Sequence, residues 1–422
     1  MDTAQQIVSG KINRNFILPV ILFFFLNIGN YSFLRYSLHG TENTSGFLNL
    51  LSGCRIALPL WIMLYSFNLH LKLTTKIFIQ NTDVFFLGIC WLLSGLLSME
   101  MSSYLLYGVW TLLSIWAILL FISYTAVISQ SLATFTFNIL RALWYGNFVI
   151  LILDFASLIF LKPSGGMLNI FFASNTFWAY PTMVMGILAL IKLRFTPAGL
   201  GKKFYYVVIL IISVVAIYFS ARRSPLFCLI FTIPLLYLPL KLPQIIFIIS
   251  LFIISYFFID PTDGKDFLDS FPDSYMKYRI ERMFGLVEGR KETSYSERQK
   301  IWNIYLNAFY KKPVMGEGLA AVNRIAEVKK NNENQLSAHN TFIGLLAETG
   351  LSGSLLLLVV IVRSILLASR ISDRVWKKIY IILFIPTLLI NWVEYNLIPG
   401  QIFFLYTMII WLLPRGLQYL KI

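Results

Sequence analysis

Residues 337–358 read SAHNTFIGLLAETGLSGSLLLL, and the stretch changes character along its length. It opens with polar residues, His339 and Asn340 among them, and ends in a run of leucines that suits lipid. A histidine therefore precedes the point where the chain is expected to enter a membrane. Two interpretations are open: His339 is a reactive group at the water–lipid boundary, or it is a polar residue where a helix starts.

The composition of the whole chain supports a membrane protein. Hydrophobic residues make up 58% of the 422 residues and charged residues only 13%, whereas about 25% of the residues of a soluble domain are charged. The mean hydropathy is +0.72. These values exclude a soluble globular chain.

Long apolar runs recur along the chain, each near the ~20 residues that cross ~30 Å of hydrocarbon. We predict an all-α integral membrane protein of about twelve transmembrane helices. Its parts are helices one to nine over residues 1–259, a large outer loop over 260–339, and helices ten to twelve over 340–422. The stretch 126–142 is expected to be an interfacial helix. The expected spans are 15–34, 47–68, 83–100, 104–125, 143–161, 176–192, 204–220, 225–241, 243–259, 346–367, 378–395 and 399–414.

Positive charges set the expected orientation, because cytoplasmic loops are rich in Lys and Arg. With both termini in the cytoplasm, the loop 260–339 lies outside. The first span reads as a signal anchor, because no small-residue cleavage site follows it. The charges assigned to the inner side are Lys11, Arg14, Lys72, Lys76, Arg141, Lys192, Arg194, Lys202, Lys203, Lys241, Arg370, Arg374, Lys377, Lys378, Arg415 and Lys421.

The net charge of +15 does not indicate binding to nucleic acid. The loop 260–339 is nearly neutral, with 13 Lys and Arg against 12 Asp and Glu. The excess lies in the cytoplasmic loops, where anionic lipid headgroups account for it. Cys54, Cys90 and Cys228 fall in expected spans and suit small buried apolar positions. No cluster of ligating residues predicts a metal, and no other cofactor is expected.

An amphipathic helix is predicted inside the large loop, where residues 294–313 read SYSERQKIWNIYLNAFYKKP. Ser296 and Gln299 form a capping-box pattern, and Pro313 ends the helix. Arg298 therefore falls in the first turn. The residues expected on one apolar face are Ile301, Ile304, Tyr305, Ala308 and Phe309.

Arg222 and Arg223 stand in a short turn between the seventh and eighth spans, on the outer side, where positive charge is disfavoured. An arginine there is expected to have a partner, and a phosphate that guanidinium grips through two hydrogen bonds is the natural one. The alternative is a pair that extends to lipid headgroups. We favour the phosphate because other ionisable candidates fall on the same side of the membrane.

These features, taken in order, resemble the bacterial O-antigen ligase and polymerase superfamily. The resemblance rests on the outer-turn arginines, Arg298 before the amphipathic helix, KPVMGEGL at 312–319 and HNTFIGLLAETGLSG at 339–353. It implies Arg223, Arg298 and His339 as site residues, although Arg222 stands where a small Ser or Thr is commoner. It also implies transfer of a glycan from undecaprenyl diphosphate to an acceptor sugar hydroxyl, at the periplasmic face of the inner membrane.

The residue types suit such a transfer. Arginines can stabilise the charge that develops on a departing diphosphate, and a histidine can take a proton from the attacking hydroxyl. The positive end of the following helix would disfavour protonation of His339, although that end could equally attract phosphate. Glu348 is the competing base, because a carboxylate inside a membrane is costly unless used. The following Gly350 and Gly353 are expected to break the helix or let it pack closely.

The acceptor is either the end of another lipid-linked repeat or the lipopolysaccharide core. A polymerase is slightly favoured over a ligase, because nothing in the chain points to a core-specific feature. A chain-length regulator is a further candidate partner. A flippase or transporter is the alternative from another class, but internal inverted repeats and charges along a mid-membrane path would be expected of it.

Overall fold

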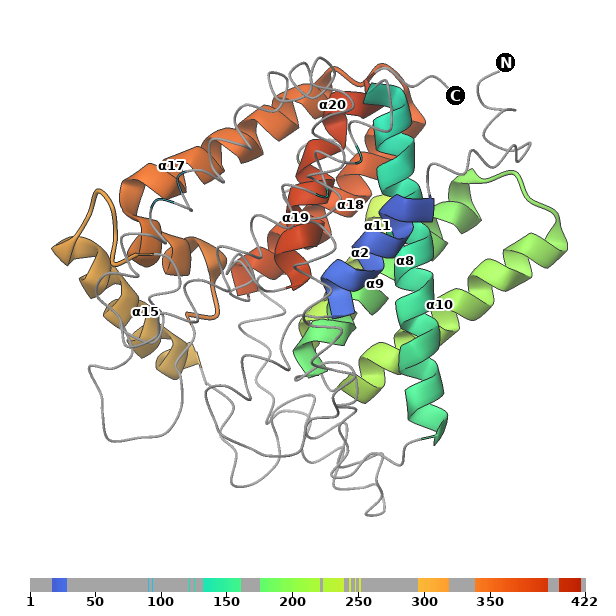
Figure 1. Ribbon diagram of the computed structural model, residues 1–422, viewed down its shortest axis with the longest axis horizontal. Helices are drawn as coiled ribbons and strands as arrows, with labels where there is room; N and C mark the ends of the chain where they lie inside the picture. The colour runs from blue at the N-terminus through green and yellow to red at the C-terminus, as the bar shows by residue number, and fades with distance from the viewer. Residues whose placement is uncertain are drawn as a thin grey trace. The chain divides into compact units, whose positions relative to one another are not determined.

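The computed structural model describes residues 17–28, 90, 93, 121, 125, 132–160, 175–220, 223–238, 243, 247, 250–251, 295–318, 338–393 and 402–418. Within these residues, the secondary-structure elements are all α-helices (Figure 1), which agrees with the all-α prediction. The predicted spans 47–68, 83–100, 104–125 and 243–259 lie outside the described residues, apart from a few single helical positions.

Four helices of the described residues are long and apolar enough to cross a membrane. They comprise Ala133–Ile152, Leu200–Tyr218, Thr341–Ser369 and Arg374–Val393. The last three match the predicted seventh, tenth and eleventh spans, and the first overlaps the predicted fifth span over residues 143–152. The helices of this part of the chain therefore fit a multi-pass membrane protein. The remaining elements in predicted spans are α2 (Ile17–Ile28), α9 (Asn175–Phe195), α11 (Arg223–Tyr237), α19 (Ile402–Leu412) and α20 (Pro414–Leu417).

Helix α8 (Leu132–Phe160) differs from the prediction, because it runs without interruption through the expected boundary at residue 143. Arg141 suggested a cytoplasmic loop, yet it lies within the helix, half-buried. The neighbouring Ala142 and Leu143 are fully buried. One charge on an otherwise packed helix does not end it, and the segment contains no proline.

The chain divides into two compact units, and α8 is shared between them. In the first unit, α2 packs on α8 where Phe23 meets Gly146. The Phe23 ring also contacts Tyr406 of α19, edge to face, with 5.5 Å between ring centroids. A side chain at position 146 would collide with this ring, so the glycine allows the close approach of α2 to α8.

The turn between α17 (Thr341–Ser369) and α18 (Arg374–Val393) is basic, as expected of a cytoplasmic turn. Asp373 starts α18, because its Oδ1 accepts hydrogen bonds from the N–H groups of Val375 and Trp376 at 2.8 and 3.0 Å. Lys377 reaches back to the Ser369 carbonyl at 2.9 Å. The side-chain cap and the lysine together define a tight helix hairpin.

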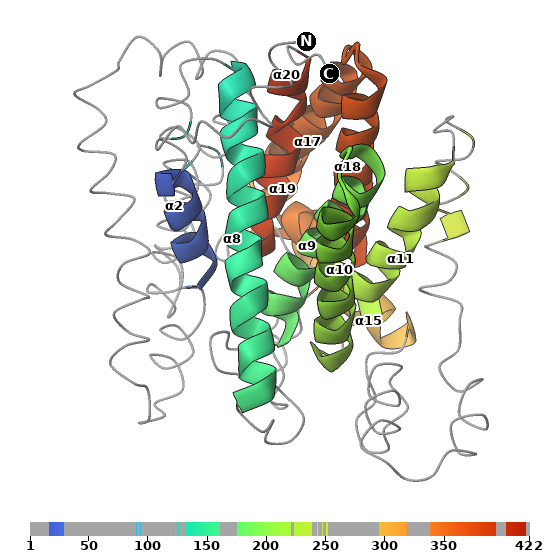
Figure 2. The same ribbon diagram turned by 90° about the vertical axis from the view of Figure 1, so that its right-hand side faces the viewer.

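In the second unit, α10 (Leu200–Ser220) packs along α9, and α11 contacts both (Figure 2). Gly186 lies at the meeting point, where a Cβ would be 3.1 Å from Leu229 of α11 and 3.4 Å from Ser213 of α10. Pro181 lies inside α9. Cys228 is fully buried, which agrees with its interpretation as a small apolar residue.

Candidate functional site

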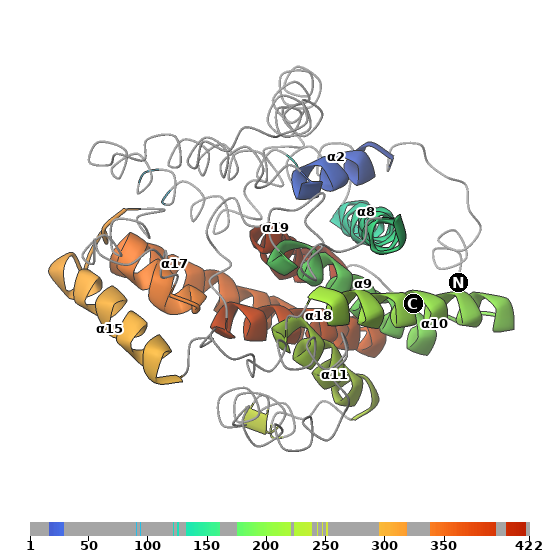
Figure 3. The same cartoon turned by 90° about the horizontal axis from the view of Figure 1, so that it is seen from below.

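Helix α15 (Tyr295–Lys311) places its apolar face against the first half of α17, and Figures 1 and 3 show the two side by side. Ile301 and Tyr305 are buried with Ala338 and Ala347, and these four residues form the centre of the contact. Ile304, Ala308 and Ile343 pack around it. The predicted apolar face of α15 is therefore confirmed, and its partner is the segment that follows His339.

Two side chains of α15 hold the peptide that precedes His339. The indole Nε1 of Trp302 donates to the Ala338 carbonyl at 2.8 Å. The Tyr305 phenol hydrogen bonds to the Ala338 backbone. Ala338 is itself fully buried, so these bonds replace water for its backbone groups. The backbone on the N-terminal side of His339 is thereby fixed by α15.

His339 is half-buried and adopts a left-handed backbone conformation, with φ of +46°. This conformation is uncommon for a residue other than glycine, although histidine is among the residues that adopt it more often. The residue after it, Asn340, is the N-cap of α17. The Asn340 Oδ1 accepts from the N–H groups of Phe342 at 2.9 Å and Ile343 at 3.1 Å. Asn340, not His339, is therefore the polar residue that starts the helix.

This cap also bears on one interpretation of the sequence. The sequence left open whether phosphate is attracted to the N–H groups at the start of α17. Two of these donors, on Phe342 and Ile343, already bond to the Asn340 side chain. A capped helix end offers fewer donors to an anion, which makes this helix end a weaker candidate for binding phosphate.

Helix α17 bends sharply at Gly350, whose φ of +62° and ψ of −159° are non-helical (Figure 1). The prediction of a helix break at this glycine is confirmed. The bend removes the helical bonds that Leu351 and Ser352 would donate one turn back. Instead, their N–H groups donate to the carbonyls of Pro313 at 2.8 Å and Val314 at 3.2 Å.

The loop of residues 313–318 also satisfies the carbonyls that the bend exposes. The N–H of Glu317 donates to the Ala347 carbonyl at 2.9 Å, and that of Gly318 donates to the Glu348 carbonyl at 2.8 Å. The loop that follows α15 thus replaces, bond for bond, the helical pairing lost at the bend. An unpaired buried backbone group is costly, so the loop and the bend depend on each other.

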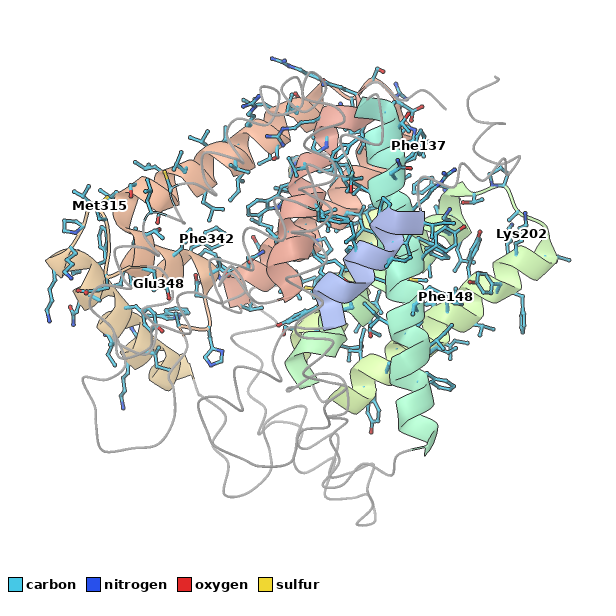
Figure 4. The ribbon with its side chains drawn as sticks, in the orientation of Figure 1. Phe137, Phe148, Lys202, Met315, Phe342 and Glu348 are labelled. Carbon is cyan, nitrogen blue, oxygen red and sulfur yellow. The ribbon has the colours of Figure 1, made fainter. Side chains whose placement is uncertain are left out.

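Glu348 lies at this bend with an exposed fraction of 0%, and Figure 4 shows it between α17 and α15. Its carboxylate is close enough to Tyr305 to act on the phenol. Burial raises the pKa of Tyr305 well above its ordinary value, and the negative charge of Glu348 raises it further. Tyr305 is therefore a neutral hydroxyl beside the buried Glu348 side chain.

A buried polar chain joins the start of α17 to the neighbouring helices. Thr341 donates to Asn391 Oδ1 of α18 at 3.0 Å. The Asn391 amide donates to the Thr387 carbonyl at 2.8 Å and to the Thr407 hydroxyl of α19 at 3.1 Å. Asn391 therefore contacts the first residue of α17, and Glu394 and Asn396 follow it in the sequence. Glu394 and Asn396 lie outside the described residues.

The glycine dependence of the bend gives a first prediction. Gly316→Ala should destabilise the protein by more than ~1–3 kcal/mol, the usual cost of a strained backbone position. Its φ is +67°, and a Cβ there would lie 2.7 Å from the Ala347 carbonyl oxygen and closer still to the Glu348 backbone. Thermal unfolding of the purified protein in detergent measures the change.

Gly201→Ala is the matched control, because nothing lies within 4 Å of its Cβ position and it stands in the first turn of α10. This variant should unfold at or above the wild-type temperature, since alanine favours helix. Equal unfolding temperatures for Gly316→Ala and Gly201→Ala would contradict the mutual support of loop and bend.

The predicted site residues fall in both units. His339 and Glu348 lie in the first unit, next in sequence to Ala338 and Ala347 of the contact with α15, whereas Arg298 falls in the second. Arg298 lies in the first turn of α15, as predicted, four residues before Trp302. Arg223 is the first residue of α11 in the second unit, and Arg222 lies outside the described residues.

Sequence reasoning gave no role to Trp302 or to the cap at Asn340, and it placed Tyr305 only on an apolar face. The sequence did indicate a role for Trp302, because a tryptophan on an amphipathic helix needs a hydrogen-bond partner for its indole N–H when it is buried. The cap at Asn340 could also have been predicted, because Asn is a preferred N-cap residue. The hydrogen bonds of Trp302 and Tyr305 with Ala338 could not be predicted from the local sequence.

Comparison with known families agrees with this arrangement. The sequence model of the family described as O-antigen ligase matches residues 167–358. The matched segment contains α9, α10, α11, α15 and the first part of α17, and with them Arg222, Arg223, Arg298, His339 and Glu348. A comparison with proteins of curated function finds no match. Residues 167–358 are therefore similar to the O-antigen ligase family, and this match supports the resemblance to the superfamily of O-antigen ligases and polymerases.

Proposed function

We propose that the protein transfers a glycan from undecaprenyl diphosphate to a sugar hydroxyl, at the periplasmic face of the bacterial inner membrane. The observation that carries the proposal is the family match over residues 167–358, which contains the two arginine positions, His339 and Glu348 in one continuous segment. The buried arrangement around Ala338 and Glu348 supports it, because a transferase needs a base held in a defined place.

The proposed reaction assigns one task to each kind of side chain. The His339 imidazole takes the proton of the acceptor hydroxyl as its oxygen bonds to the anomeric carbon of the donor sugar. The bond from that carbon to the diphosphate oxygen breaks, and undecaprenyl diphosphate leaves. Arg223 and Arg298 stabilise the charge that gathers on this leaving group, with Arg222 as a secondary contact.

Glu348 has a supporting task in this proposal and is the alternative base. It is fully buried beside the neutral Tyr305, and its backbone belongs to the bonded bend of α17. Its supporting task is to shape the site at this bend. No metal and no other cofactor has a part in the proposed steps.

Two acceptors fit the same donor chemistry. We propose polymerisation first, in which the hydroxyl belongs to the end of another lipid-linked repeat, and a chain-length regulator is then an expected partner. The second candidate is ligation to the lipopolysaccharide core, and the description of the matching family favours it. Membrane lipids surround the protein in either case, and nucleic acid has no part.

Deletion of the gene in its own host tests both candidates, with the lipopolysaccharide resolved by gel electrophoresis. Loss of the polymerase should leave molecules with a single repeat on the core. Loss of the ligase should leave core without repeats while lipid-linked glycan accumulates. Unchanged surface glycan, with no lipid-linked material accumulating, would contradict the proposed function.

A topological prediction accompanies this proposal. A cysteine at Asn332 should react with an impermeant thiol reagent in cells whose outer membrane alone has been made permeable, because the large loop is proposed to face the periplasm. The native Cys54, Cys90 and Cys228 would first be replaced by alanine. Labelling only after the inner membrane is disrupted would reverse the orientation.

A further inference from the structure

An exposed apolar surface lies where α15 ends. Tyr310, Val314 and Met315 have exposed fractions of 70%, 62% and 43%, although each is large and hydrophobic. We name these three residues the apolar tip. Scattered single hydrophobic residues on a surface need no explanation, but contiguous ones mark an interaction site.

The apolar tip is continuous with the outward surface of α17. The carbonyls of Pro313 and Val314 accept from Leu351 and Ser352 of α17, and the Ser352 hydroxyl lies 3.8 Å from the Met315 sulfur. Figure 4 shows Met315 beside the bend of α17. From this point the exposed side of α17 is apolar: Leu351, Leu355, Leu358, Val359, Val362, Ile365 and Leu366.

The position of the bend along α17 gives the depth of the apolar tip. Helix α17 ends at Ser369, just before the exposed Arg370 in the basic turn. Since ~20 helical residues cross ~30 Å of hydrocarbon, a span that starts at this turn reaches the opposite boundary close to Gly350. The residues that bond to the bend therefore lie at the level where hydrocarbon meets headgroups.

The polar neighbours of the apolar tip suit the same level. Lys311 and Lys312 are exposed, and Lys312 pairs with Glu317 at 2.9 Å. Lysine at an interface extends its charge toward anionic headgroups while its stem lies along apolar surface. Tyrosine is enriched at the same level of membranes. The tip thus combines the residue types of an interfacial anchor.

We propose that the apolar tip is a membrane anchor, with Val314 and Met315 inserted in the lipid of the leaflet that the bend of α17 adjoins and Lys311 at its headgroups. The occupant of this surface is bilayer lipid. The anchor would fix the C-terminal end of α15, and with it the peptide before His339, at a set depth. This inference rests on the membrane spans and does not depend on the proposed glycan transfer.

Spin labels on the full chain test the anchor in vesicles of phosphatidylethanolamine and phosphatidylglycerol. After the three native cysteines are replaced, labels are attached at Val314→Cys and Met315→Cys. Asn303→Cys and Asn307→Cys are the matched controls, because both positions are exposed on the same helix. Leu355→Cys, exposed on α17, reports full contact with lipid.

The labels at 314 and 315 should collide more often with oxygen, which concentrates in lipid, than with a water-soluble nickel chelate. Their depth should be ~5–10 Å below the headgroup boundary, shallower than the label at 355. The labels at 303 and 307 should show the opposite preference. The proposal is overturned if the labels at 314 and 315 collide with the nickel chelate as often as the control labels do. It is equally overturned if both reagents are excluded, which would indicate contact with another protein surface.

Discussion

His339→Ala should lower the rate of glycan transfer by ~10²–10⁴-fold, the range that general-base catalysis contributes. Binding of the lipid-linked donor should persist, because in the proposed reaction the arginines hold the diphosphate. The variant should thus look inactive in cells and retain a trace of turnover in a purified assay. Rate and donor affinity, measured separately on the same preparation, check both halves of the prediction.

His339→Gln separates proton transfer from positioning. Glutamine keeps a hydrogen-bonding side chain but cannot accept a proton at neutral pH. If His339 takes the proton, His339→Gln should be about as slow as His339→Ala. A near-normal rate in His339→Gln would move the base to Glu348.

Asn340→Ala is the structural control for the histidine. It removes the side chain that caps α17 and should cost ~0.5–2 kcal/mol of stability, with no loss of a proton acceptor. Comparing Asn340→Ala with the His339 variants shows whether His339 is a reactive group or only a polar residue where a helix starts. If His339 variants lose stability and keep their rate, the histidine only precedes a helix.

Arg298→Lys should be the second severe variant, with a large loss of transfer and unchanged protein abundance in the membrane. Lysine keeps the positive charge but lacks the planar fork that binds a diphosphate through paired hydrogen bonds. Hydrogen bonds to charged groups contribute ~1.5–3 kcal/mol each, so the rate should fall by at least about tenfold. Arg223→Lys should behave in the same way.

Two variants serve as controls for the arginines. Lys300→Ala removes an exposed cation from the same helix as Arg298 and should leave the rate unchanged. Arg222→Ala should be milder than Arg223→Ala, because the family resemblance assigns the diphosphate to residue 223. An inactive Arg222→Ala beside an active Arg223→Ala would exchange the roles of these neighbours.

Local sequence patterns were sufficient to predict much of the fold. The apolar runs at 204–220 and 378–395 predicted α10 and α18 closely, because a membrane span needs only length and hydrophobicity. The amphipathic spacing of residues 294–313 predicted α15, and Pro313 predicted its end. Helix α8 was misjudged at Arg141, because a single charge inside a long helix resembles a loop charge until its neighbours are seen to be packed.

The candidate site was predicted only in part. His339 and Glu348 could be singled out because ionisable groups at a membrane boundary are unusual. The bonds from Trp302 and Tyr305 to Ala338 join residues more than thirty positions apart, and helical periodicity carries no information at that distance. The pairing of residues 313–318 with the bend of α17 could not be predicted from the sequence either, because its hydrogen bonds join backbone groups.

The most direct test of the account is transfer by the purified protein in vesicles. The protein would be supplied with undecaprenyl-diphosphate-linked repeats alone, or with added lipopolysaccharide core, and the products separated by length. The wild-type protein should form new glycosidic bonds and release undecaprenyl diphosphate, and His339→Ala should give almost none of either. Growth of chains without core would assign polymerisation, and transfer only in its presence would assign ligation. Intact donor in both reactions, with properly folded protein, would contradict the proposed transferase function.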